Sequence, residues 1–154
     1  MPEAKGRTQI KTLTLKGRAD RIDRTADGLL SIIDYKTGAT PSKAEVLTGI
    51  EPQLQLLALI ATHGGFANIA AADCASLEYW SLKGGRSGCK IVRFTEDLAS
   101  LITQADNGLR DLIETFADPK TPYEAAPKPR LQPRHNDYAH LSRLAEWGRT
   151  VDDA

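Results

Sequence analysis

The pattern of apolar and polar positions predicts a pair of β-strands in the first forty residues. Residues 10–24 are rich in Thr, Leu and Ile and are expected to form one long strand. Residues 29–37 are mostly apolar and are expected to form a second strand, buried at the centre of a sheet. The intervening Thr25-Ala26-Asp27-Gly28 has the composition of a tight turn. Together these segments predict an antiparallel hairpin.

Two helices are expected after this hairpin. Ser42 and Glu45 have the spacing of a capping box, so a short helix should begin there and stop at Gly49. Pro52 suits the first turn of a second helix. That helix, QLQLLALIAT over residues 53–62, is apolar nearly all round, which predicts that it is buried between other elements.

A strand pair and a long helix are expected in the second half. Residues 76–83 and 89–95 have strand character and are joined by the Gly-rich loop 84–88. Thr95 is expected to cap a helix that continues to about Phe116. Its apolar residues recur with the 3.6-residue period: Leu98, Leu101, Ile102, Ala105, Leu109, Leu112, Ile113 and Phe116. This order predicts an α/β (or α+β) domain, with a mixed sheet flanked by helices.

The carboxyl-terminal part has a different composition. Five of the eight prolines fall within residues 119–133, which predicts an extended linker. Tyr138, Leu141, Leu144 and Trp147 recur every three residues, which predicts a short helix that docks back. The expected division is therefore a core over residues 1–118, followed by a linker and docking helix over residues 119–154.

Composition and length exclude several classes of protein. At 154 residues, with 41% hydrophobic residues, the chain can bury a core without disulfide or metal support. No apolar run approaches the roughly 18–20 residues that cross a bilayer, and the first residues lack a secretory signal, so a cytoplasmic protein without membrane contact is expected. Cys74 and Cys89 are too few for an iron–sulfur cluster and are expected to stay reduced.

A net charge of zero hides a basic amino-terminal segment. Residues 1–24 contain seven basic residues and three acidic ones. Such a local excess can attract nucleic acid, and Lys16, Arg18 and Arg21 are the candidate contacts. A solvated strand face explains the same feature equally well.

The second strand carries the chemistry that stands out. Because side chains alternate along a strand, Leu30, Ile32, Asp34 and Lys36 share one face. Charge on a row that faces the core costs several kcal/mol unless it is paired or bound to a metal. One interpretation is an Asp34–Lys36 ion pair at the end of a strand.

The hairpin register adds a second carboxylate. If Ile22 faces Ile32, then Asp20 faces Asp34, and directly opposed Cβ atoms lie about 5 Å apart. Two like charges at that distance indicate a divalent cation such as Mg²⁺ between them. Asp23 points to the other face and is expected to be a surface or salt-bridging residue. A metal beside Lys36 would suit phosphodiester hydrolysis, with the lysine orienting water or offsetting negative charge.

These residues also resemble a known family. Residues 17–23 (GRADRID) and 32–38 (IIDYKTG) resemble two motifs of the RecB-family nuclease domains, within the PD-(D/E)xK superfamily, whose fold is restriction-endonuclease-like. Residues 52–57 resemble the family's helical Gln motif. Residues 137–147 are similar to the ends of AddB chains, the subunits whose carboxyl-terminal nuclease domains the sequence resembles most.

The resemblance implies site residues and partners. Asp20 and Asp34 would hold Mg²⁺ or Mn²⁺, Lys36 would be the catalytic lysine, and Gln53 would lie near the site. The implied activity is a DNA exonuclease in recombinational double-strand break repair, within a complex that has an AddA-like helicase subunit. Without the resemblance, Gln53 would be interpreted as a helix-end residue that hydrogen-bonds locally.

Three features depart from the family. Leu57 stands where a tyrosine is common, four cysteines for an iron–sulfur cluster are missing, and only sixteen residues precede Gly17, where the family has a helix with a further site residue. The chain is therefore expected to belong to a longer protein and to cleave poorly alone. The alternative is a DNA-binding or partner-docking module with the same fold. A third interpretation is an unrelated enzyme with a chance Asp-x-Lys pattern.

Overall fold

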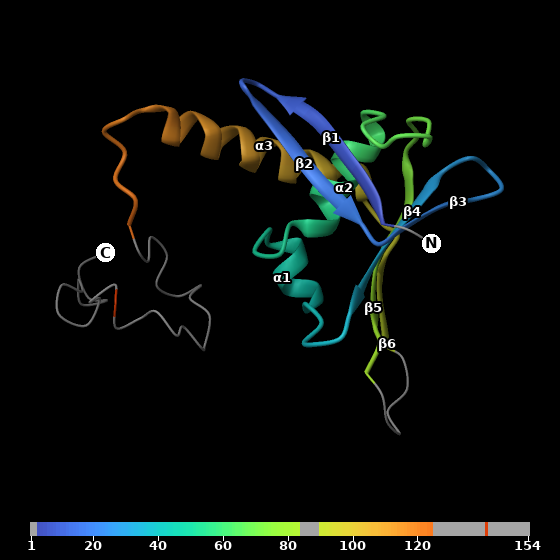
Figure 1. Cartoon of the computed structure of the whole chain (residues 1–154). Coiled ribbons are helices and arrows are strands. Elements are labelled where there is room, and N and C mark those ends of the chain that lie inside the picture. Colours follow the sequence, from blue (N-terminus) through green and yellow to red (C-terminus); the bar gives the residue numbers. More distant parts are fainter. Residues whose placement is uncertain (1–2, 84–89, 125–140, 142–154) are drawn as a thin grey trace. The chain divides into compact units, whose positions relative to one another are not determined.

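The computed structural model describes residues 3–83, 90–124 and 141 (Figure 1). The chain divides into two units, Met1–Phe116 and Ala117–Ala154, and the fold and the candidate site both lie in the first. The predicted 84–88 loop, most of the predicted linker and the predicted terminal helix, apart from Leu141, lie outside the described residues.

A four-stranded mixed sheet forms the framework of the first unit. Its order is β3 (Arg21–Arg24), β4 (Leu30–Lys36), β5 (Cys74–Ser81) and β6 (Lys90–Phe94). The β3–β4 and β5–β6 pairs are antiparallel, whereas β4 and β5 run parallel. Parallel neighbours need a crossover, and α1 (Lys43–Leu47) and α2 (Gln53–Thr62) supply it. The predicted mixed α/β sheet with flanking helices is confirmed.

A separate hairpin precedes this sheet. Strands β1 (Ala4–Ile10) and β2 (Leu13–Ala19) pair antiparallel, from Ala4↔Ala19 to Ile10↔Leu13. The expectation of one strand over residues 10–24 was therefore wrong. The chain bends at Asp20, so β2 stays with β1 while β3 pairs with β4. The bend at Asp20 therefore divides the segment between two sheets.

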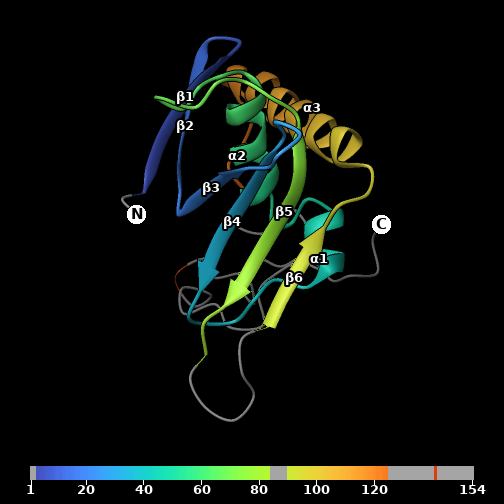
Figure 2. The ribbon, with the colours of Figure 1, turned by 90° about the vertical axis from the view of Figure 1, so that its right-hand side faces the viewer.

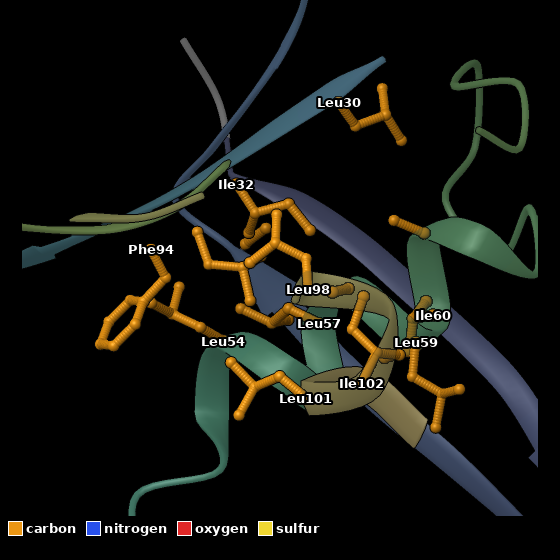
Figure 3. Packing of buried hydrophobic residues seen from close by; sticks show 14 of the residues in the cluster. Leu30, Ile32, Leu54, Leu57, Leu59, Ile60, Phe94, Leu98, Leu101 and Ile102 are labelled. Carbon is orange, nitrogen blue, oxygen red and sulfur yellow. The ribbon is translucent and has the colours of Figure 1, made fainter. Parts of the chain in front are cut away.

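The core lies between the sheet and the helices. The first unit has its helices on one side of the sheet, as the edge-on view of Figure 1 and the face-on view of Figure 2 show. Figure 3 shows Ile32 of β4, Leu54 and Leu57 of α2, and Leu98 and Ile102 of α3 (Leu98–Ala117) gathered there. Seven of the ten residues of α2 are buried, because it contacts β1 and β2 on one side and β4 and β5 on the other. The predicted burial of this helix is confirmed.

The helix ends follow the predicted signals only in part. Ser42 and Glu45 form the capping box of α1, and Gly49 follows it at a φ of 75°. Pro52 is the N-cap of α2 rather than a residue of its first turn. Thr95 does not cap α3, because the Leu101 amide donates to the carbonyl of Asp97, 3.0 Å away. Within the described ranges, no helix is both long and apolar enough to cross a membrane.

Candidate active site

The candidate site is built at the carboxyl end of β4. The predicted hairpin register is observed, with Ile22 opposite Ile32, and the ladder ends at Arg21↔Ile33. Asp20 lies one residue beyond the ladder, in the bend, where its Oδ2 accepts a hydrogen bond from the Tyr35 amide at 2.7 Å. This bond holds Asp20 against the edge of β4 beside Asp34.

Asp34 is a buried carboxylate on the core-facing row of β4. Its residue is 4% exposed, next to the fully buried Ile32 on the same face. A charge at this depth must be balanced by its neighbours, because the unpaired ion would cost several kcal/mol. The structure supplies that balance from Lys36 on the same strand and Gln53 at the start of α2.

Gln53 joins the two charged groups into a closed ring. Its Nε2 donates to Asp34 Oδ1 at 2.6 Å, and its Oε1 accepts from Lys36 Nζ at 2.7 Å. Lys36 Nζ in turn lies 2.9 Å from Asp34 Oδ2. Gln53 thus hydrogen-bonds across to the sheet, and the start of α2 fixes the positions of the carboxylate and the ammonium together.

The ring does not fully compensate the burial of Asp34. Burial raises the pKa of the Asp34 carboxyl, the Lys36 ammonium lowers it, the Asp20 charge raises it, and Gln53 lowers it, with a net rise. Asp34 Oδ2 also accepts no hydrogen bond within the described residues, although Lys36 lies close to it. The carboxylate therefore remains destabilised in its charged form.

Tyr79 is a neighbour that the sequence did not reveal. It stands opposite Asp34 in the parallel β4–β5 register and is fully buried. Its ring centroid lies 5.3 Å from Lys36 Nζ, a distance at which the π face attracts the cation. The position depends on which residues of β5 pair with β4, and a crossover of two helices leaves that register undetermined by the sequence.

The donor set fits a divalent cation with few protein ligands. Asp20 uses Oδ2 for the Tyr35 amide and Asp34 uses Oδ1 for Gln53, while Asp34 Oδ2 faces the Lys36 ammonium at 2.9 Å. Mg²⁺ commonly takes one or two carboxylates and completes its shell with water and phosphate. No group of three or more potential metal-binding side chains occurs in the described part of the chain. Within the described residues, Asp20 and Asp34 are the carboxylates that the β3–β4 register brings together at this site.

The three predicted nucleic-acid contacts lie in two places. Lys16 and Arg18 are exposed on β2, and Arg18 Nη1 lies 2.9 Å from Glu3 Oε2. Arg21 instead pairs with Asp23 at 2.6 Å and lies over the Trp80 ring, 5.7 Å from its centroid. The expectation that Asp23 is a surface or salt-bridging residue is confirmed as far as the ion pair is concerned.

The chain matches a family model and is similar to segments of several known proteins. Residues 3–134 match the family model of the PD-(D/E)XK nuclease superfamily. An uncharacterized protein of Rickettsia bellii is 38% identical over 56 residues, which cover 36% of this chain and 7% of that protein. An uncharacterized protein of Rickettsia conorii is 35% identical over 68 residues, which cover 42% of this chain and 8% of that protein.

These relatives are much longer than this chain, so the similarity concerns one segment of each. No solved structure gives a significant match. The family model, by contrast, spans β1 to β6 and all three helices, and so includes every residue of the candidate site. The chain therefore belongs to the PD-(D/E)XK nuclease superfamily.

Proposed function

We propose that this domain is a metal-dependent deoxyribonuclease whose site consists of Asp20, Asp34, Lys36 and Gln53. The observation that carries the proposal is the Asp34–Lys36–Gln53 ring beside the Asp20 carboxylate. A buried carboxylate with a raised pKa, next to a second carboxylate and a fixed ammonium, is typical of a functional site.

Asp20 and Asp34 would hold the cation, Mg²⁺ or Mn²⁺. When bound, the metal supplies Lewis acidity toward the phosphate and lowers the pKa of a water molecule. The Tyr35 amide would orient the Asp20 carboxylate and Gln53 would orient the Asp34 carboxylate, each through one hydrogen bond. Partners of metal ligands commonly have this role.

Lys36 would act on the reacting phosphate. Its ammonium now balances the negative charge of Asp34, and a bound cation would supply that balance instead. Gln53 Oε1 and the Tyr79 ring would keep the ammonium at the same place. From there Lys36 can offset the negative charge that develops on the phosphate, which is the largest kind of catalytic contribution in such sites.

The finer assignment is a RecB-family domain, most like the nuclease domains of AddB. We propose an exonuclease of double-strand break repair that works beside an AddA-like helicase subunit. The spacing of Asp20, Asp34, Lys36 and Gln53 supports the family choice. The match to short segments of long relatives supports a nuclease domain that is carried within a larger protein.

The test is degradation of end-labelled linear DNA with Mg²⁺, with Mn²⁺ and with EDTA. Cleavage should require the metal and should fall by about two to three orders of magnitude in Lys36→Ala, if the ammonium acts in the transition state. Lys43→Ala, which changes an exposed lysine of α1, is the control and should cleave like the wild type. Metal-dependent cleavage that survives Lys36→Ala would contradict the assignment.

A second candidate is a module that binds DNA or a partner without cleaving. The Lys36 contacts support this candidate, because an ammonium that pairs with Asp34 and donates to Gln53 can have the structural role of balancing the Asp34 charge. Under this alternative Lys36→Ala would destabilise the fold and leave DNA binding unchanged. Absence of cleavage under all metal conditions by a longer protein that includes the native upstream segment, with DNA binding retained, would favour it.

A further inference from the structure

The outward face of the β1–β2 hairpin carries a groove lined by cations. The groove has a volume of about 590 Å³ and is lined by Lys5, Gly6, Arg7, Lys16, Gly17, Arg18, Gly65 and Ala67. Its four charged residues are all basic, and we call it the basic groove. It is separate from the Asp34 ring, which belongs to β4 and α2.

The cations face one another in pairs across the hairpin. Lys5 lies opposite Arg18 and Arg7 lies opposite Lys16 in the strand register. Like charges that are directly opposed destabilise a strand pair. Within the described residues only Arg18 of the four has an acidic partner, Glu3. The arrangement therefore costs stability, and an anionic ligand between the cations would offset that cost.

The floor of the basic groove is held rigidly. Gly6 and Gly17 are paired, and a Cβ atom would lie 2.6 Å from the Phe66 ring at Gly6 and 2.8 Å from Leu57 at Gly17. The Arg7 amide donates to the Gly65 carbonyl at 2.9 Å, which ties a third chain segment to the edge of β1. The backbone that carries the four cations is therefore fixed by its contacts with the core, so little ordering of the backbone is needed when a ligand binds.

The groove is continuous in the chain with the candidate active site. Lys16 and Arg18 are followed by Ala19, where β2 ends, and by Asp20. Successive cation pairs are two residues apart, which is about 7 Å along a strand. The Lys5–Arg18 pair is therefore the level nearest to Asp20 along the chain, and the Arg7–Lys16 pair lies one level further away.

We propose that the basic groove binds the phosphate backbone of one nucleic-acid strand and leads it to Asp20. The identity of the ligand rests on the proposed nuclease function. The contacts would be to phosphates and not to bases, because the groove offers ammonium and guanidinium groups and no acceptor for base edges among its side chains. Binding should therefore be independent of sequence and sensitive to salt.

The experiment is fluorescence anisotropy of a labelled oligothymidine in EDTA, where cleavage cannot occur. The variant is Arg7→Gln/Lys16→Gln, and the matched control is Lys43→Gln/Lys90→Gln, which removes the same charge from exposed residues of α1 and β6. Loss of two phosphate contacts should lower affinity about ten- to thirtyfold at 0.1 M salt and reduce the slope of log K against log salt by about 1.4. The control should change little.

Equal affinity in the groove variant and the control would overturn the proposal, and so would wild-type protein that fails to bind the oligonucleotide. Competition by polyglutamate as effective as by oligothymidine would assign the groove to an acidic protein instead. The groove variant should melt no lower than the wild type, since it relieves an opposed cation pair. Wild-type protein that binds the oligonucleotide but cleaves no DNA with Mg²⁺ or Mn²⁺ would contradict the nuclease proposal and leave the groove standing, so the two failures are separable.

Discussion

At the scale of single residues, two buried carboxylates of the sheet behave in opposite ways. Burial alone would raise the pKa of Glu78, but hydrogen bonds from Ser76, Trp80 and Arg93 outweigh it and hold this pKa below its usual value. Asp34 is equally buried, yet the pKa of its carboxyl stays raised. The charged form of Glu78 is thus fully stabilised by its hydrogen bonds, whereas the charged form of Asp34 is not fully stabilised by the fold.

The Asp34 charge should lower the stability of the metal-free protein at neutral pH. Between the ordinary and the raised pKa of Asp34, the folded state binds more protons than the unfolded state, so stability falls as pH rises through this window. Asp34→Asn should therefore melt at or above the wild-type temperature in EDTA at pH 7–8, while losing metal-dependent cleavage. The difference should shrink as pH falls below the raised pKa. A variant that melts lower at pH 8 would mean that the Lys36 pair makes the charge stabilising.

The second prediction concerns Gln53. Gln53→Leu removes both hydrogen bonds that hold the Asp34 carboxylate and the Lys36 ammonium. Misplacement of a catalytic group by about 1 Å can cost on the order of a hundredfold in rate. We expect a loss of about ten- to a hundredfold in kcat for cleavage.

Gln55→Leu is the control for this change. Gln55 is buried two residues further along α2, but it donates to the Val46 carbonyl of α1 at 2.8 Å and not to the site. The Gln55→Leu variant should therefore have a lower melting temperature but an unchanged kcat in the folded enzyme. If both variants lose kcat equally, Gln53 acts only through the stability of α2.

Part of the site could be predicted from the sequence and part could not. The Asp20–Asp34 neighbourhood followed from a two-strand register fixed by a short turn and the Ile22–Ile32 pair. The place of Tyr79 beneath Lys36 did not, because it depends on a parallel register set by distant residues. The register of a hairpin such as β3–β4 is set by residues close together in the chain, whereas the register of the parallel strands β4 and β5 depends on how the connecting helices pack.

At the scale of elements, the same distinction separates correct from wrong expectations. The all-round apolar character of α2 correctly predicted a helix between two layers. The expectation of one continuous strand over residues 10–24 was wrong because β-propensity does not show where a strand changes its pairing partner. Strand β1 was not predicted because its sequence has no clear alternation of apolar and polar residues. Thr95 has a side chain that can cap a helix, but a bend at residues 96–97 follows it after the end of β6, and α3 begins only at Leu98.

The third prediction concerns the contact between the hairpin and α2. A Cβ atom at Gly17 would lie 2.8 Å from Leu57 and 2.9 Å from Ile60, both of which are buried in α2. Gly17→Ala should therefore lower the free energy of unfolding by about 1–3 kcal/mol, the usual cost of overpacking a core. Gly38→Ala is the control, since nothing lies within 4 Å of the added atom. Chemical denaturation of both variants decides, and equal stability would mean that the hairpin moves away from α2 without cost.

At the scale of the whole molecule, folding and cation binding should be coupled. A ligand that binds only the folded state stabilises it by RT ln(1 + [L]/Kd), about 2.7 kcal/mol at a hundred times Kd. Asp20 lies in a bend and Asp34 in a strand, fourteen positions apart in the chain, and they are brought together only when β3 pairs with β4. The unfolded chain therefore lacks the site, and all of the binding energy adds to the stability of the fold.

The last prediction is a thermal shift with Mn²⁺ that EDTA reverses. The wild type should melt several degrees higher at saturating Mn²⁺, and the shift should vanish as pH falls below the raised pKa of Asp34, because the ligand must be deprotonated. Asp20→Asn and Asp34→Asn should each abolish most of it. Asp23→Asn is the matched control, because Asp23 is paired with Arg21 and belongs to the opposite face of the sheet, so its Mn²⁺ shift should equal that of the wild type. A full shift in Asp34→Asn would place the cation elsewhere in the molecule and remove the basis for treating the Asp20–Asp34 pair as the metal site.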